Sequence, residues 1–245
     1  MDRDEIAHIL GLEAQAVRII PSACGGGFGG KLDLSVQPLI ALAAWVLKHP
    51  VRAVFSRTES MASSTKRHPT QISARAMAAA DGRLLGLELF GEYNTGAYAS
   101  WGPTVAGRVP VHAAGPYVVP NVLCNTPTYY TNQPPAGAFR GFGTPQAAIA
   151  QEMLYDQLAD KLNLDRWAFR YQNAIVEGDL TATGQRLNSS VGMCECLTAL
   201  HPQWQAMLTD ADVFNRQPDP VRRGVGIACM WYGCGNTSLS NPSTM

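Results

Sequence analysis

The sequence predicts an α+β fold, in which helices and strands are mixed along 245 residues. Three observations support this prediction. Short runs rich in Val, Ile and Leu are typical of strands, and they are interspersed with segments whose apolar residues recur at helical spacing. Two glycine-rich loops lie between such segments. Because 46% of the residues are hydrophobic, the chain can build the core of one large domain, or of one domain and part of a neighbour.

The first part of the chain is predicted to alternate between helix and strand around a glycine-rich loop. Residues 34–48 have apolar side chains at helical spacing, and Pro38 is tolerated because it lies near the start of the predicted helix. The short apolar runs that flank the loop and this helix are typical of strands. The expected elements are a helix over 4–12, a strand over 16–20, a loop over 21–30, a helix over 34–48 and a strand over 51–56.

A β-hairpin and a long irregular stretch follow. Residues 71–80 and 84–93 are predicted to be two strands joined by a turn at Asp81-Gly82-Arg83. Residues 94–119 are rich in Gly, Pro and aromatic side chains and show no clear period. We expect a loop of this length to be functional or to pack against something. A further strand is expected over 121–131.

The second glycine-rich loop, residues 133–143, leads into helices. Thr144-Pro145 has the N-cap and first-turn signature of a helix that runs to about Asn163, and Asp165 is expected to cap a short helix through Asn173. A strand-like run over 223–232 begins a unit that then stops, which predicts a chain that has been cut. We therefore expect one domain over residues 1–217 and the truncated start of a second over 218–245.

Composition excludes several classes of protein. The formal net charge is zero and no basic stripe is present, which argues against nucleic-acid binding. No apolar stretch approaches the roughly 18 residues that cross a bilayer. The first ten residues carry Asp2, Asp4 and Glu5 where a secretory leader would be apolar. None of the six cysteines has the C-x2-C spacing of zinc or iron–sulfur ligands, so reduced thiols in a cytoplasmic protein are expected.

The first glycine-rich loop, Cys24-Gly-Gly-Gly-Phe-Gly-Gly-Lys31, matches two nucleotide-binding patterns. The dinucleotide pattern G-x-G-x-x-G also requires an acidic residue about 20 positions later, and none is present there. The phosphate loop requires Ser or Thr after the lysine to hold magnesium, but Leu32 stands there. Both nucleotide interpretations therefore lack their second element. What remains is bare backbone that can approach a ligand closely and offer N–H groups to oxyanions. The alternative is a tight strand-to-helix connection.

The second glycine-rich loop places Arg140 between Phe139 and Phe142 and just before a predicted helix start. A guanidinium beside a helix N-terminus is typical of an anion-binding site. The alternative is a surface arginine in a solvated loop. The two aromatic neighbours favour a partly buried pocket.

Together these loops resemble the signatures of the large, molybdopterin-binding subunit of molybdenum hydroxylases, the family of xanthine dehydrogenases and aldehyde oxidases. The resemblance rests on Gly26-Gly-Phe-Gly-Gly-Lys31 and on Gly137-Ala-Phe-Arg-Gly-Phe-Gly143 with Pro145-Gln146. It extends through Thr65-Lys-Arg-His-Pro69, Glu177-Gly-Asp-Leu180 and Gln185-Arg-Leu187. It therefore covers most of the chain and implies the first molybdopterin-binding domain of that family.

The resemblance implies that this chain binds a molybdenum–molybdopterin cofactor, with or without a dinucleotide extension. Phe28 and Arg140 are expected beside the molybdenum without ligating it, and Arg67, Phe142 and Leu32 are expected to contact substrate. Leu32 stands where xanthine-oxidising relatives have a glutamate, so the resemblance does not imply the usual recognition of xanthine. The expected cofactor-binding residues are Gly26, Gly27, Phe28, Gly29, Ala138, Phe139, Arg140 and Gly141.

The resemblance also implies that essential parts lie elsewhere. The catalytic base, a glutamate, is expected outside this sequence, and iron–sulfur clusters and FAD are expected on partner domains or subunits. The predicted function is hydroxylation of an electron-poor carbon in a purine-like N-heterocycle or an aldehyde, with water as the oxygen source. We expect the isolated chain to be inactive and to self-associate through uncovered apolar surface. The alternatives are a nucleotide-binding module that uses residues 25–31 and a non-catalytic assembly subunit.

Overall fold

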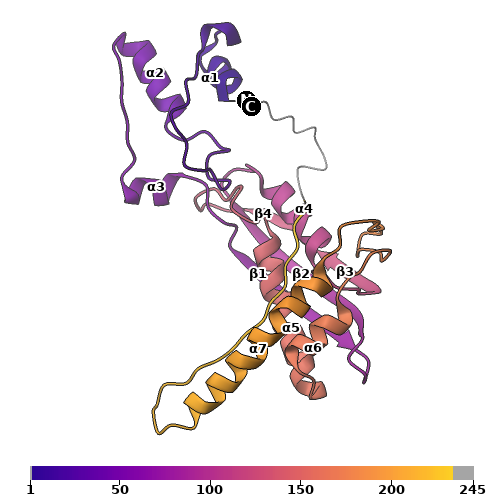
Figure 1. The fold of residues 1–245 in the computed structure, drawn as a ribbon. Helices are drawn as coiled ribbons and strands as arrows, with labels where there is room; N and C mark the ends of the chain where they lie inside the picture. Colours follow the sequence, from indigo (N-terminus) through magenta and orange to yellow (C-terminus); the bar gives the residue numbers. More distant parts are fainter. Residues whose placement is uncertain (1, 234–245) are drawn as a thin grey trace. The chain divides into compact units, whose positions relative to one another are not determined.

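The structure is a computed structural model that describes residues 2–233 (Figure 1). It combines helices with a four-stranded sheet, which confirms the predicted α+β class. None of the helices in the described range is both long and apolar enough to cross a membrane. The elements are α1 (Asp2–Leu10), the short 3-10 helix η1 (Ala14–Ala16), α2 (Gln37–Leu47), α3 (Arg57–Ser63), β1 (Thr70–Ala78), β2 (Leu84–Gly96), α4 (Gly102–His112), β3 (Asn121–Asn125), β4 (Thr128–Tyr130), α5 (Thr144–Leu162), α6 (Arg166–Asn173) and α7 (Met193–Asn215).

The chain forms two compact units, and the long strand β2 has residues in both. The first unit comprises the described residues up to Thr70 together with Tyr93–Val105 and Thr128–Phe142. The second comprises Gln71–Glu92, Ala106–Pro127 and the described residues from Gly143 onward. Both glycine-rich loops therefore belong mainly to the first unit.

The second unit is built on the predicted hairpin. Strands β1 and β2 are neighbours in the sheet, and the turn between them closes with a 2.8 Å hydrogen bond from the amide of Ala79 to the carbonyl of Arg83. Strand β3 pairs in parallel with β2, so that Gly86 faces Asn121. Helix α6 is tied to the hairpin by Asn173, whose side chain accepts from the amide of Leu84 at 2.8 Å and donates to the carbonyl of Gly82 at 2.9 Å. The core of this unit includes Leu87, Leu89, Val109, Tyr117, Tyr155 and Phe169.

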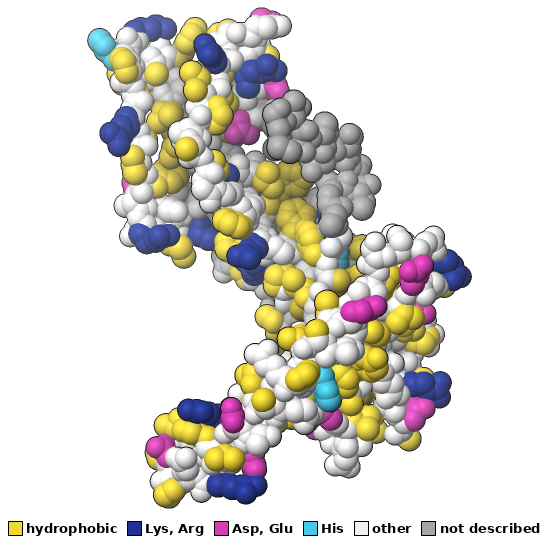
Figure 2. All heavy atoms as spheres, viewed as in Figure 1, with side chains coloured by type: hydrophobic (Ala, Val, Ile, Leu, Met, Phe, Trp, Pro, Cys, Tyr) yellow, Lys and Arg dark blue, Asp and Glu magenta, His cyan; other side chains and the backbone are white. Residues whose placement is uncertain are grey.

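The first unit contains the last part of β2, which pairs in parallel with β4. An isolated bridge joins Lys66 to Ala136, with hydrogen bonds from Lys66 N to Pro135 O at 3.2 Å and from Gly137 N to Lys66 O at 3.0 Å. Helix α2 has apolar side chains all around its axis and no buried residue. Leu39, Val46 and Leu47 are each at least 60% exposed, and Figure 2 shows apolar side chains at the surface of the region where Figure 1 places α2.

Several helix predictions are confirmed, with shifted ends. Helices α1, α2, α5 and α6 occur where they were expected, and the side chain of Asp165 caps α6 by accepting from the amide of Ala168. Helix α5 begins at Thr144, but its N-cap is Gly143, which has a φ of 94°. Thr144 is therefore the first helical residue and not the cap.

Three predicted strands, over 16–20, 51–56 and 223–232, are wrong: the structure has no strand in these ranges. Ile20 and Val54 are each 74% exposed and Met230 is 58% exposed, so these runs have not found a partner strand that buries them. A β-prone sequence becomes a strand only when another edge accepts its backbone hydrogen bonds. The single strand expected over 121–131 is instead two strands, β3 and β4, on either side of Thr126 and Pro127, because proline has no amide to donate to the ladder.

Three helices were missed. Helix α3 has a capping box, in which the Ser56 side chain accepts from the amide of Glu59 and the Glu59 carboxylate accepts from the amide of Ser56. Helix α4 lies within the stretch that was expected to be a loop and contains Pro110. Helix α7 contains Pro202. The proline in each of α4 and α7 interrupts the pattern that would have predicted the helix.

Candidate functional site

The two glycine-rich loops touch through their backbones in the first unit. Gly29 has a φ of +91°, and a Cβ atom there would lie 2.8 Å from the carbonyl carbon and oxygen of Ala138 and from the amide nitrogen of Phe139. Ala138 is fully buried. Only a residue without a side chain allows this approach. The structure thus brings the two glycine-rich loops into direct contact.

The first loop is held open by its own turns. Gly26, Phe28 and Gly29 all have positive φ, and Phe28 is unusual in this because it is not glycine. Hydrogen bonds from Gly30 N to Gly27 O at 3.0 Å and from Leu32 N to Gly29 O at 3.2 Å fix the loop. In the described part of the chain, no acceptor bonds to the amides of residues 26–29. These four N–H groups are therefore available to a ligand.

Lys31 stabilises this loop from within. Its ammonium donates to the carbonyl of Gly26 at 2.7 Å and to the sulfur of Cys24 at 3.0 Å. The hydrogen bond from Lys31 lowers the pKa of the exposed Cys24 thiol. A phosphate-loop lysine would instead extend toward a nucleotide, and the segment before this loop is not a strand. The structure therefore lacks two further features of the nucleotide-binding interpretation.

The second loop presents a cation beside the first. The guanidinium of Arg140 lies 5.4 Å from the ring centroid of Phe28, which is 64% exposed. The loop is closed by a 2.7 Å hydrogen bond from Phe142 N to Phe139 O, with positive φ at Gly141 and Phe142. Apart from the Phe28 ring, the Arg140 side chain has no hydrogen-bond or ion-pair partner among the residues that the structure describes. Its charge is thus available to an anion.

The residues expected to contact substrate occupy different surroundings. Leu32 is 43% exposed next to the first loop. Phe142 is half-buried and lies edge-on to Trp101, with ring centroids 6.2 Å apart. Arg67 is half-buried and donates from Nη2 to the carbonyl of Arg140 at 2.5 Å, and its guanidinium lies 4.7 Å from the ring centroid of Phe139. The fold thus places all three residues in the first unit, with the two loops.

Sequence reasoning missed Trp101. It lies just before α4, in the stretch for which no period was found, and it supports Phe142 from the side. The abundance of aromatic residues in that stretch was the available signal. Phe139, which was expected to be partly buried, is 42% exposed.

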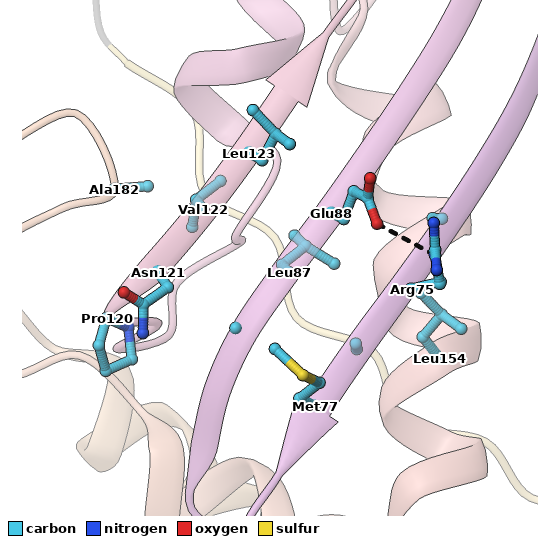
Figure 3. Close-up of a pocket in the computed structure, with 13 residues that line it drawn as sticks. Arg75, Met77, Leu87, Glu88, Pro120, Asn121, Val122, Leu123, Leu154 and Ala182 are labelled. Atoms are coloured by element: carbon cyan, nitrogen blue, oxygen red, sulfur yellow. Dashed lines mark ion pairs between the residues drawn. The ribbon is translucent and has the colours of Figure 1, made fainter.

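The structure has a small cavity close to the first loop and a larger groove away from both loops. A cavity of about 210 Å³ in the first unit is lined by Gly30, Asp33, Tyr98 and Pro135, among others. A groove of about 890 Å³ lies over strands β1, β2 and β3 of the second unit. Figure 3 shows this groove, with Arg75 of β1 and Glu88 of β2 joined by a 3.0 Å ion pair. None of the predicted site residues lines the groove, so its size does not make it the functional site.

Comparison with known proteins places these loops in a defined family context. Residues 1–174 match the family model described as the molybdopterin cofactor-binding domain. The chain is 50% identical over 198 residues to the nicotinate dehydrogenase large molybdopterin subunit of Eubacterium barkeri, covering 80% of this chain and 46% of that protein. It is 35% identical over 232 residues to the xanthine dehydrogenase molybdenum-binding subunit of Escherichia coli, covering 94% of this chain and 31% of that protein. The chain thus spans less than half the length of these relatives.

Solved structures agree. The aldehyde oxidoreductase of Desulfovibrio gigas superimposes with a TM-score of 0.82 at 31% identity, covering 86% of this chain and 23% of that one. The quinoline 2-oxidoreductase of Pseudomonas putida superimposes with a TM-score of 0.80 at 26% identity, covering 87% of this chain and 28% of that one.

Proposed function

We propose that the two glycine-rich loops form half of the cofactor pocket of a molybdenum hydroxylase. The premise is that the chain belongs to the molybdopterin cofactor-binding domain family. The single observation that carries this proposal is that the available guanidinium of Arg140 lies 5.4 Å from the Phe28 ring, beside a loop whose amides at residues 26–29 have no acceptor in the described structure. Such donors bind an anionic group through hydrogen bonds.

The donor set fits the proposed cofactor. Molybdopterin brings its own sulfur ligands to the metal, so the protein needs to supply hydrogen-bond donors and close backbone approach. In the described range, no group of three or more His, Cys, Asp or Glu side chains is placed to ligate a metal. Backbone amides and a guanidinium suit an anionic cofactor better than a bare cation.

Each loop residue then has a distinct task. The amides of Gly26, Gly27, Phe28 and Gly29 would donate to the cofactor, and Phe28 would lie beside the metal without ligating it. Arg140 would supply positive charge to the same anionic group. Ala138, Phe139 and Gly141 would complete the site, since Phe139 accepts the hydrogen bond that closes the turn around Arg140 and Gly141, and the backbone of Ala138 lies against Gly29. When bound, the cofactor supplies two-electron redox chemistry and activates water.

The substrate that we propose is an electron-poor N-heterocycle, with an aldehyde as the alternative. The relative that shares 50% identity is named for nicotinate, and one structural neighbour is named for quinoline. Leu32 offers an apolar surface and no carboxylate for a purine N–H, and the Phe142 ring can stack on a heteroaromatic ring. Arg67 was expected to orient the substrate, and that role remains a prediction.

We propose that activity requires further protein. The partners are the remainder of a molybdopterin subunit, which brings the glutamate base, and domains or subunits that carry iron–sulfur clusters and FAD. In this scheme residues 1–217 are one cofactor-binding domain, residues 218–245 begin the next, and the assembly is cytoplasmic. The strand predicted over 223–232 is absent from the structure, and residues 234–245 lie outside the described residues.

The test is the molybdenum and pterin content of the purified complex that contains this chain. Arg140→Ala should lower molybdenum per chain and abolish turnover while the complex still assembles, because the variant removes the available cation. Arg52→Ala, at an exposed arginine outside both loops, is the matched control and should retain both. Equal molybdenum content in the two variants would refute the cofactor site. Full activity of Arg140→Ala would favour an assembly subunit.

A further inference from the structure

We infer that Arg67 is a positioning residue that braces the second loop, and that it holds the turn from Phe139 to Phe142 so that Arg140 stays beside Phe28. This inference rests on the proposed function for its consequence in the enzyme, but the brace itself is a property of the chain. It differs from a role in orienting substrate, because the arginine would act through the protein backbone.

The brace begins in the backbone. The segment that carries Arg67 is bonded edge to edge to the segment that leads into the second loop, through Lys66 N to Pro135 O and Gly137 N to Lys66 O. The Lys66 ammonium is itself anchored at 2.7 Å to the carbonyls of Ser60 and Ser64. Residue 67 is therefore fixed at the base of the loop.

The Arg67 side chain continues this connection into the loop. It reaches across 73 positions of sequence to donate to the carbonyl of Arg140 at 2.5 Å, and the central carbon of its guanidinium lies over the ring of Phe139, 4.7 Å from the ring centroid. A guanidinium can do both at once because its donors lie in its plane and its faces stay open for an aromatic ring. The side chain thus contacts two successive residues of one turn.

Arg140 depends on this support. Its own side chain has only the Phe28 ring as a partner in the described structure, so nothing at its tip fixes where it points. Its position is set by its backbone, which is held by Arg67 at the carbonyl and by the Phe142–Phe139 hydrogen bond that closes the turn. Loss of the brace should free the turn and let the guanidinium move away from the first loop.

Hydrogen exchange of the Phe142 amide in the full chain tests the brace without any cofactor. In Arg67→Met we expect exchange about tenfold faster or more, because the charge-assisted hydrogen bond that holds the Arg140 carbonyl inside the turn is lost and the Phe142–Phe139 hydrogen bond opens more often. Arg67→Lys keeps the charge and a donor but not the planar guanidinium over Phe139, and we expect it also to exchange faster than the wild type. The control Arg52→Met should match the wild type. Residues 84–92 of β2, in the second unit, should be unchanged in all variants.

The outcomes separate the two proposals. Wild-type exchange of Phe142 in Arg67→Met would overturn the brace, and so would wild-type exchange in Arg67→Lys if Arg67→Met fails to fold. In the complex, a positioning role predicts lower molybdenum content or kcat with unchanged KM, and a raised KM alone would instead support substrate orientation. If Arg140→Ala keeps its molybdenum while Arg67→Met exchanges faster, the brace stands and the cofactor proposal fails.

Discussion

Arg170 and Glu152 form a buried ion pair whose removal should destabilise the second unit strongly. The Arg170 side chain is fully buried, with its Nη2 atom 2.6 Å from a carboxylate oxygen of Glu152 and 2.8 Å from one of Asp156. Its Nε donates to Glu152 at 2.8 Å, and the Tyr117 hydroxyl donates to the other Glu152 oxygen at 2.8 Å. Burial and the nearby Glu152 charge both raise the pKa of Tyr117, so it stays a donor at any physiological pH.

The perturbation is Arg170→Met, which keeps most of the side-chain volume and removes the charge. Glu152 would then be a buried carboxylate with its cation missing, a change that costs about 3–5 kcal/mol. This is a large share of the roughly 5–15 kcal/mol that stabilises a typical domain. Adding Glu152→Gln should recover part of the loss, because a neutral amide can still accept from Tyr117.

The assay is urea unfolding of both variants and the wild type, followed by circular dichroism. Arg83→Met, at an exposed arginine paired with Asp81, is the control, and we expect its effect to be below about 1 kcal/mol. The reasoning would be refuted if Arg170→Met cost no more than this surface pair. It would also be refuted if the added Glu152→Gln change made the protein less stable still.

Three further predictions concern the first unit. Gly29→Ala should lower the free energy of unfolding in urea by about 1–3 kcal/mol and reduce the molybdenum content, since its Cβ would strike the second loop. The control Gly25→Ala meets no atom within 4 Å and should change neither quantity appreciably. Burial lowers the pKa of His68 from 6.5 to about 4, so the unfolded chain takes up a proton before the folded one does. The free energy of unfolding should therefore fall by at most about 3 kcal/mol as the pH drops from 6.5 to about 4. In His68→Leu, the free energy of unfolding should depend less on pH over the same range. The exposed apolar surface of α2 predicts that the isolated chain self-associates, which sedimentation velocity can measure. The double variant Leu39→Glu, Leu42→Glu should associate less, and a wild-type chain that stays monomeric at high concentration would contradict this prediction.

Local signals in the sequence determined several of the helices, the hairpin turn and the close backbone contact of the first loop. The Asp81-Gly82-Arg83 turn, the Asp165 cap and the proline at the start of α5 each act within a few residues, and the elements that they predict are present. The glycines of the first loop predicted close backbone contact, because only residues without Cβ permit it. The two loop motifs together were specific enough to indicate the family.

Only the tertiary structure decided which apolar runs became strands and which arginine met which partner. The runs at 16–20 and 51–56 are β-prone, but a strand depends on a partner edge that is often distant in sequence, and none accepts them here. The sequence marks Arg140 by its aromatic and glycine neighbours, but it does not show which group either Arg67 or Arg140 contacts. The fold gives Arg67 the carbonyl of Arg140 and leaves the Arg140 guanidinium available, because contacts between residues 73 positions apart are set by packing and not by spacing.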